Sequence, residues 1–129
     1  MGAFDVLGIA GSSMGMHQSW LDCVSNNIAN INTAMPTSGP AFQAQYAMAA
    51  ATPGGGVRLS GIAVGDPTGR VVYQPDSPVA DANGYVRMPD IDLGSQMSQL
   101  IMAQRGFQAQ AAVVRDAQDV YASALSIGR

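Results

Sequence analysis

Apolar residues recur at alternating spacings of three and four positions in the first and last thirds of the chain. In the first third, the series comprises Leu7, Ala10, Met14, His17, Leu21, Val24, Ile28 and Ile31. In the last third, it comprises Leu93, Met97, Leu100, Gln104, Phe107, Ala111, Val114, Gln118, Tyr121 and Leu125. A heptad pattern sustained over three or more repeats predicts helices that pack along a seam. Two ordinary amphipathic helices of a bundle would show the same pattern. That alternative has the same helices and differs only in which helix each one packs against.

The middle of the chain, residues 34–89, has a different pattern. Residues 57–64 alternate between apolar and polar, slip at Gly61 and resume, which predicts a short strand with a bulge. Residues 70–73 predict a second strand, and an Asn-Gly turn leads into a third at residues 85–88. The Ala-, Pro- and Gly-rich stretch before these strands predicts a flexible connector.

These patterns predict a mainly α fold. The N- and C-terminal helices are expected to pack as an antiparallel coiled-coil-like hairpin, with a small β-rich central insertion. The expected parts are an N-terminal helix in residues 1–33, a flexible connector and β-rich insertion in residues 34–89, and a C-terminal helix in residues 90–129. Asp90 or Asp92 can begin the last helix by accepting backbone N–H bonds.

Charged residues are scarce and of restricted kinds. They make up 12% of the 129 residues, and all of them are Arg or Asp. Because surfaces poor in charge favour association, the composition favours an assembled protein over a sparsely charged monomer. The net charge is -3 and the first Arg is Arg58, so no basic patch is present to bind nucleic acid. The absence of positive charge before Arg58 also argues against a signal peptide, and no run of about 18 apolar residues predicts a membrane span.

Residues with catalytic potential are few. The only histidine, His17, lies on the apolar seam, where a core histidine is a better explanation than a catalytic one. Cys23 is the only cysteine and fits a small buried apolar residue. The four Asp residues between positions 76 and 92 match no calcium loop, and turn or capping roles explain them. We therefore expect no enzyme, no cofactor and no metal site.

The stretch NNIANINTAMP, residues 26–36, contains four asparagines around the end of the first predicted helix. Asn offers hydrogen-bond donors and acceptors without charge, and the four lie off the apolar seam. A helix stop explains Asn32. Because buried amides need partners, Asn27 and Asn30 are expected to bond to adjacent subunits.

Several stretches together carry a family resemblance. Leu21 is followed by NIAN at residues 27–30 and then by Thr33, and the stretch SPVADANGYVRMPDID fills residues 77–92. AQRGFQA (103–109) and ALSIG (124–128) lie in the last helix. The sequence thereby resembles the axial proteins of the bacterial flagellum, and within them the proximal-rod branch, FlgC, over nearly the whole chain.

The chain departs from that branch in several places. Gln96 stands where the branch usually carries Glu, and no Lys lies near Gln118, where the branch usually has one. The stretch FQAQ at residues 42–45 has no charge where the branch carries basic residues. Gly94 and Gly106 are expected to loosen the last helix, because glycine disfavours helix interiors. These departures bear on particular subunit contacts and not on the fold.

The resemblance implies a structural subunit of the proximal rod of the flagellar basal body, which polymerises through its terminal helices to form the drive shaft and catalyses nothing. The implied partners are copies of itself, other rod and axial proteins, basal-body ring proteins and the flagellar type III export apparatus, without nucleic acid or a small-molecule substrate. The implied location spans the periplasm, reached without a cleaved signal peptide. The alternative is a helical-hairpin adaptor that forms a small defined complex.

The seam and the family motifs together define an expected assembly surface. Its residues are Leu7, Met14, Leu21, Val24, Asn27, Ile28, Asn30, Ile31, Met97, Leu100, Arg105, Phe107, Val114, Tyr121 and Leu125.

Overall fold

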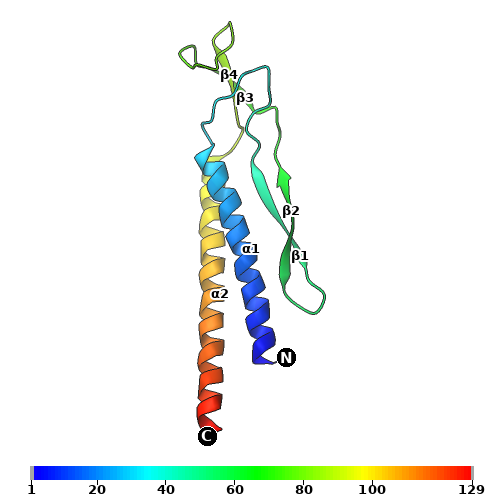
Figure 1. The fold of residues 1–129 in the computed structure, drawn as a ribbon. Helices are drawn as coiled ribbons and strands as arrows, with labels where there is room; N and C mark the ends of the chain where they lie inside the picture. Colours follow the sequence, from blue (N-terminus) through cyan, green and yellow to red (C-terminus); the bar gives the residue numbers. More distant parts are fainter. Residues whose placement is uncertain (1, 129) are drawn as a thin grey trace.

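The computed structural model describes residues 2–128, apart from the side chain of Ala3, and within them the chain forms two helices and four strands (Figure 1). The helices are α1 (Ala3–Ala29) and α2 (Leu93–Ile127). The strands between them are β1 (Gln45–Ala51), β2 (Val57–Val64), β3 (Arg70–Tyr73) and β4 (Tyr85–Met88). The predicted fold class, mainly helical with a small antiparallel strand region, is confirmed at this level.

The two helices lie side by side, and the start of α1 and the end of α2 are at the same end of the molecule (Figure 1). The predicted seam of α1 is covered along its length, and Ala10 and Val24 on it are buried. The helices have 27 and 35 residues, so α2 continues past the start of α1. Neither described helix is long and apolar enough to cross a membrane.

On one side of the face that α2 turns toward α1, the buried residues lie one position earlier in the sequence than the predicted seam residues. Leu100, Phe107 and Val114 are half-buried as expected. The fully buried residues, however, are Gln96 and Ala103, whereas the predicted seam members Met97, Gln104 and Gln118 are exposed. The expected seam was therefore wrong for that half of the face. Gln96 replaces Met97 because its amide bonds to a buried partner in α1, described below.

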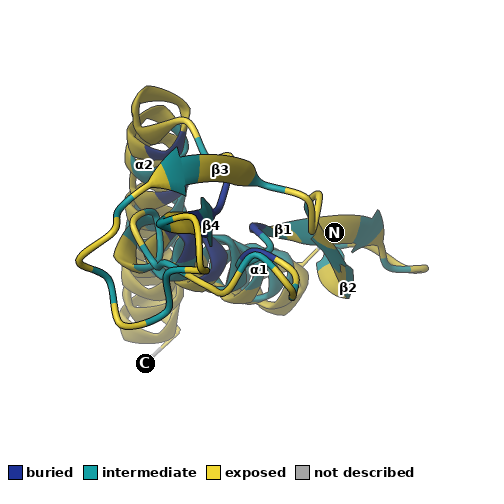
Figure 2. Cartoon of the chain, turned by 90° about the horizontal axis from the view of Figure 1, so that it is seen from above, coloured by how far each residue is buried: buried dark blue, intermediate teal, exposed yellow. Residues whose placement is uncertain are grey.

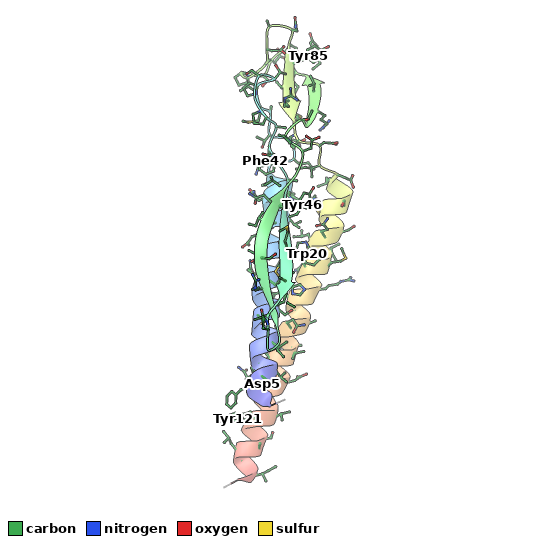
Figure 3. The ribbon with its side chains drawn as sticks, turned by 90° about the vertical axis from the view of Figure 1, so that its right-hand side faces the viewer. Asp5, Trp20, Phe42, Tyr46, Tyr85 and Tyr121 are labelled. Atoms are coloured by element: carbon green, nitrogen blue, oxygen red, sulfur yellow. The ribbon has the colours of Figure 1, made fainter. Side chains whose placement is uncertain are left out.

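Strands β1 and β2 form an antiparallel hairpin that runs along α1 (Figures 1 and 3). Met48 pairs with Gly61 and Ala49 with Leu59, so Ser60 has no partner. The predicted bulge is thereby confirmed, one residue before the glycine. Because directly paired residues share a face of the sheet, the bulge keeps Leu59 and Ile62 on the same face although they are three positions apart.

Strand β1 lies in the stretch that was expected to be a flexible connector, so that expectation is wrong for residues 45–51. Its sequence, QYAMAAA, is rich in alanine, which is depleted in strands. The residue pattern therefore did not predict a strand there. The second and shorter pair, β3 and β4, lies at the opposite end of α1 from the chain termini (Figure 1). Val86 and Met88 of β4 are buried there.

The connection between α1 and β1 reaches back to this second pair. The backbone N–H of Met35 donates to the carbonyl of Arg87 at 2.8 Å, and the N–H of Arg87 donates back to Met35 at 2.8 Å. Asp92 begins α2 as expected, because its Oδ2 accepts the N–H of Ser95 at 2.8 Å. Seen down the long axis, the buried residues gather where β4 meets the helices, and much of α2 is exposed (Figure 2).

Candidate assembly surface

Asn27 is the buried junction of three elements. Its side chain has an exposed fraction of 0%. Its Nδ2 donates to the carbonyl of Gln45 in β1 at 2.9 Å and to Oε1 of Gln96 in α2 at 3.0 Å. Its Oδ1 accepts the backbone N–H of Gln45 at 2.7 Å. The amide thus pairs with Gln45 as a peptide group of a neighbouring strand would. The hydrogen-bond partners of Asn27 lie within the chain, whereas the sequence predicted partners in an adjacent subunit.

The other asparagines also bond within the chain. Asn26 donates from Nδ2 to Oε1 of Gln45 at 3.1 Å. Asn30 donates to the carbonyl of Asn26 at 2.9 Å, and its Oδ1 accepts the hydroxyl of Thr33 at 3.1 Å. These contacts close the last turn of α1 and the turn after it. Asn30 therefore has a capping role within its own chain, and its expected bonds to another subunit stay a prediction.

His17 packs between the helices, as expected for a core histidine. Its Nδ1 lies 2.7 Å from the carbonyl of Ser13. Its ring lies against Gly106 of α2, where a β-carbon would overlap it. Beside it, the indole N–H of Trp20 donates to Oε1 of Gln99 at 3.3 Å. Gly106 therefore provides space for a side chain of α1. The sequence predicted only that this glycine loosens α2, and not this packing role.

Among residues 2–128, three titratable groups have displaced pKa values. Burial, and then the nearby Asp22 carboxylate, raise the pKa of the Cys23 thiol. The backbone N–H of Tyr85, and then the Thr37 hydroxyl, lower the pKa of Asp81. The backbone N–H and side chain of Thr68 lower the pKa of Asp66. Each carboxylate anchors its own turn, and among the described residues no three His, Cys, Asp or Glu side chains are grouped to hold a metal ion.

The last turns of α2 expose large apolar side chains. The exposed fractions are 67% for Val120, 54% for Leu125 and 85% for Ile127. Near the start of α1, the ring of Phe4 contacts that of Tyr121 edge-on, with centroids 5.4 Å apart. Residues 122–128 lie beyond that contact and are all exposed. A cavity of about 330 Å³ opens between the start of α1 and the turns of α2 that precede these residues. It is lined by Val6, Val113, Asp116, Ala117 and Val120.

The residues of the expected assembly surface fall into three groups by exposure. Val24 and Asn27 are buried. The half-buried members are Leu7, Met14, Leu21, Ile28, Asn30, Ile31, Leu100, Phe107 and Val114. The exposed members are Met97, Arg105, Tyr121 and Leu125. The spacing of apolar residues did not indicate Gln45, Gln96 or Gln99, because these three side chains are amides that bond across elements.

Comparisons with known proteins define the class. A family model described as the C-terminal part of the FlgEFG flagellar basal body rod proteins matches residues 82–127, which include β4 and α2. Over the full length of both chains, the protein is 34% identical to the flagellar basal-body rod protein FlgC of Yersinia enterocolitica, 29% identical to that of Salmonella typhimurium and 26% identical to that of Bacillus subtilis. The class is that of the flagellar basal-body rod proteins.

Within this class, the chain belongs to the FlgC family. It is accordingly a structural subunit of the proximal rod of the flagellar basal body, as the resemblance predicted. Its relatives are structural proteins, and assembly with other rod components follows from membership of the family.

Proposed function

We propose that the chain polymerises through its two terminal helices, with copies of itself and other rod proteins, to form the drive shaft. In the assembled rod, α1 and α2 form an antiparallel coiled-coil-like hairpin that packs against those of neighbouring subunits. The observation that carries the proposal is the end of α2, where residues 122–128 have no cover and Leu125 and Ile127 are exposed. Apolar surface that remains in water in the single chain is the surface that association removes.

The composition of this end suits burial against a protein partner. Between Val120 and Gly128 there is no charged side chain. Covering such a surface therefore has no cost for desolvating a charge, while each square ångström of apolar area removed from water contributes about 25 cal/mol. Met97 and Tyr121 extend the exposed apolar surface along α2. Arg105 lies between them, exposed, and would take a polar position in the interface.

The half-buried residues serve two contacts in this proposal. Leu7, Met14 and Leu21 lie on the covered side of α1 but keep part of their surface exposed. They can therefore touch α2 of their own chain and a helix of a neighbour. Asn27 has a different task in assembly from the one expected, since it fixes the base of the hairpin and α2 relative to α1.

We further propose that the protein transmits torque and catalyses nothing, and that it works where the rod crosses the periplasm. The proposed route is the flagellar type III export apparatus, without a cleaved signal peptide, and the ring proteins are proposed as additional partners. The family resemblance supports each of these points. The side chains of His17, Asp81 and Asp92, each held in its own turn or helix contact, are consistent with a structural role.

The test uses a surface variant that leaves the single chain intact. Leu125→Asp places a charge on the exposed end of α2, and Gln108→Asp places the same charge at an exposed position of α2 outside residues 122–128. In cells that lack the native gene, we expect Leu125→Asp to abolish swimming and to be missing from purified hook–basal bodies. Gln108→Asp should retain most function, and circular dichroism should show both chains folded. Normal swimming with Leu125→Asp would exclude this end as an assembly contact. Recovery of the unmodified chain only in a small soluble complex would favour an adaptor.

A further inference from the structure

The β1–β2 hairpin touches α1 at its two ends and leaves a cavity between them. At its base, Gln45 bonds to Asn27. At its tip, the backbone N–H of Val57 donates to the hydroxyl of Ser12 at 3.1 Å. The cavity between these attachments has a volume of about 370 Å³. It is lined by Met16, His17, Trp20, Ala47, Ala49 and Val57.

The two attachments differ in strength. The base is held by both backbone groups of Gln45 through the fully buried Asn27, with a further bond from Asn26 to the Gln45 side chain. The tip is held by one hydrogen bond to Ser12, whose hydroxyl also donates to Ile9 at 2.8 Å. A buried network is opened less often than a single bond at the surface, because opening it leaves several polar groups without partners.

The turn at the tip depends on glycine. Gly54, Gly55 and Gly56 have φ values of 90°, 110° and 94°, in the left-handed region that favours glycine. Gly56 also lies so close to α1 that a β-carbon would be 2.7 Å from the Ser12 hydroxyl. The three glycines of the tip therefore approach the helix by their backbone, and the only side chain of the tip that lines the cavity is that of Val57.

The middle of the hairpin adds little that would keep it closed. The β1 residues that line the cavity, Ala47 and Ala49, are small and bury little apolar area against α1. The unpaired Ser60 divides the hairpin into a base half and a tip half. A bulge interrupts the ladder and is a natural place for a strand pair to bend.

We propose that the tip half of the hairpin, residues 49–59, is a strap that detaches from α1 and bends at the Ser60 bulge. Asn27 keeps the base in place during this motion. Opening uncovers the floor of the cavity, and with it the indole of Trp20. The motion belongs to the single chain and does not require assembly, so it can be present whether or not the terminal helices polymerise.

Hydrogen exchange in the purified full-length chain tests the unequal attachments. The reporters are the amide of Val57 at the tip and the amide of Gln45 at the base. We expect the Val57 amide to exchange faster than the Gln45 amide by about tenfold or more, after correction for intrinsic rates. Equal protection of the two amides would overturn the proposal, because the hairpin would then open as one unit or not at all.

Fluorescence gives a second measurement, since Trp20 is the only tryptophan. Ser12→Ala removes the tip acceptor and should raise the acrylamide quenching constant of Trp20 about twofold or more while the Gln45 amide keeps its protection. Ser19→Ala is the matched control, since it removes a hydroxyl from the same helix that donates to Gly15. If the quenching constant of Trp20 is the same in Ser12→Ala as in Ser19→Ala, the proposal of a strap held at its tip is contradicted.

Discussion

The imidazole of His17 in α1 lies against Gly106 in α2, at a point where any larger residue would overlap its Nε2 and Cδ2 atoms. The ring is held in place by the contact of its Nδ1 with the carbonyl of Ser13 at 2.7 Å. A glycine inside a helix costs about 1 kcal/mol relative to alanine. At position 106, this cost is offset by the space that it gives to the histidine, and the pair sets how closely the two helices approach there.

Gly106→Ala should therefore destabilise the chain, although the same change usually stabilises a helix. We expect the free energy of unfolding in urea to fall by about 1–3 kcal/mol, because an added methyl group in a packed contact forces the neighbours apart. Gly11→Ala is the control, since a β-carbon at Gly11 would meet nothing within 4 Å. It should raise stability by about 0.5–1 kcal/mol. A Gly106→Ala chain as stable as the Gly11→Ala chain would show that the His17 contact does not limit the helix spacing.

Asn27→Ala should be among the most damaging polar substitutions in the chain. It removes three hydrogen bonds and leaves the backbone of Gln45 and the amide of Gln96 without partners in a buried place. We expect a loss of about 2–4 kcal/mol in the free energy of unfolding. Ser25→Ala, at an exposed position of the same helix, should change it by less than about 0.5 kcal/mol. Equal midpoints in urea for the two variants would disprove the role of Asn27 as a junction.

Asp81 should make the stability of the folded chain depend on pH in the acid range. Its carboxylate accepts the N–H groups of Tyr85 and Asn83, each at 2.9 Å, and the hydroxyl of Thr37 at 2.9 Å. The Tyr85 bond, followed by the Thr37 bond, lowers the folded-state pKa below its ordinary value of 3.8. The stabilising effect is therefore present above the ordinary pKa and is lost as the pH falls through the lowered one.

Asp81→Asn should flatten the stability profile in this acid range, because the amide does not titrate. Thermal unfolding midpoints between about pH 5 and pH 2 would measure the effect. Asp76→Asn removes another exposed carboxylate of the same insertion and serves as the control. Parallel profiles for the wild type and Asp81→Asn would mean that the hydrogen bonds to this carboxylate do not contribute.

Cys23 should react slowly in the folded chain. Its side chain is 3% exposed, and burial followed by the Asp22 carboxylate raises the pKa of the thiol. Since the thiolate is the reacting form, iodoacetamide at pH 8 should modify the folded protein at least about tenfold more slowly than the urea-unfolded protein. Mass spectrometry follows the added group. A Cys23→Ala, Ser25→Cys double variant should react quickly in the folded state, and an equally fast reaction at Cys23 would show that the helix packing opens readily.

Much of the architecture could be predicted from local pattern. Both helices, the β2 strand with its bulge and the cap at Asp92 follow from residue spacing or capping chemistry, which are local properties. Strand β1 could not be found in this way. Its alanines are poor strand formers, and they occupy a strand because Gln45 is held by Asn27 and because the partner strand β2 supplies the ladder.

The candidate surface shows the same limit. The spacing of apolar residues found Leu100, Phe107 and Val114, but it could not choose between Met97 and Gln96 for the buried position. That choice is made by Asn27, 69 positions away in sequence. Hydrophobicity alone favours Met97, whereas a buried amide that needs a partner favours Gln96, and the second effect decides the rotation of this part of α2.

The unequal lengths of α1 and α2 give the end of the helix pair the shape of a step. Two flush ends can meet at many rotations about their common axis, whereas a stepped end accepts a partner in one orientation and from one side. Because the projecting residues 122–128 carry no charged group, these residues give the step its direction by shape and not by charge. The step therefore gives the helix pair a polarity that any joint made there must follow.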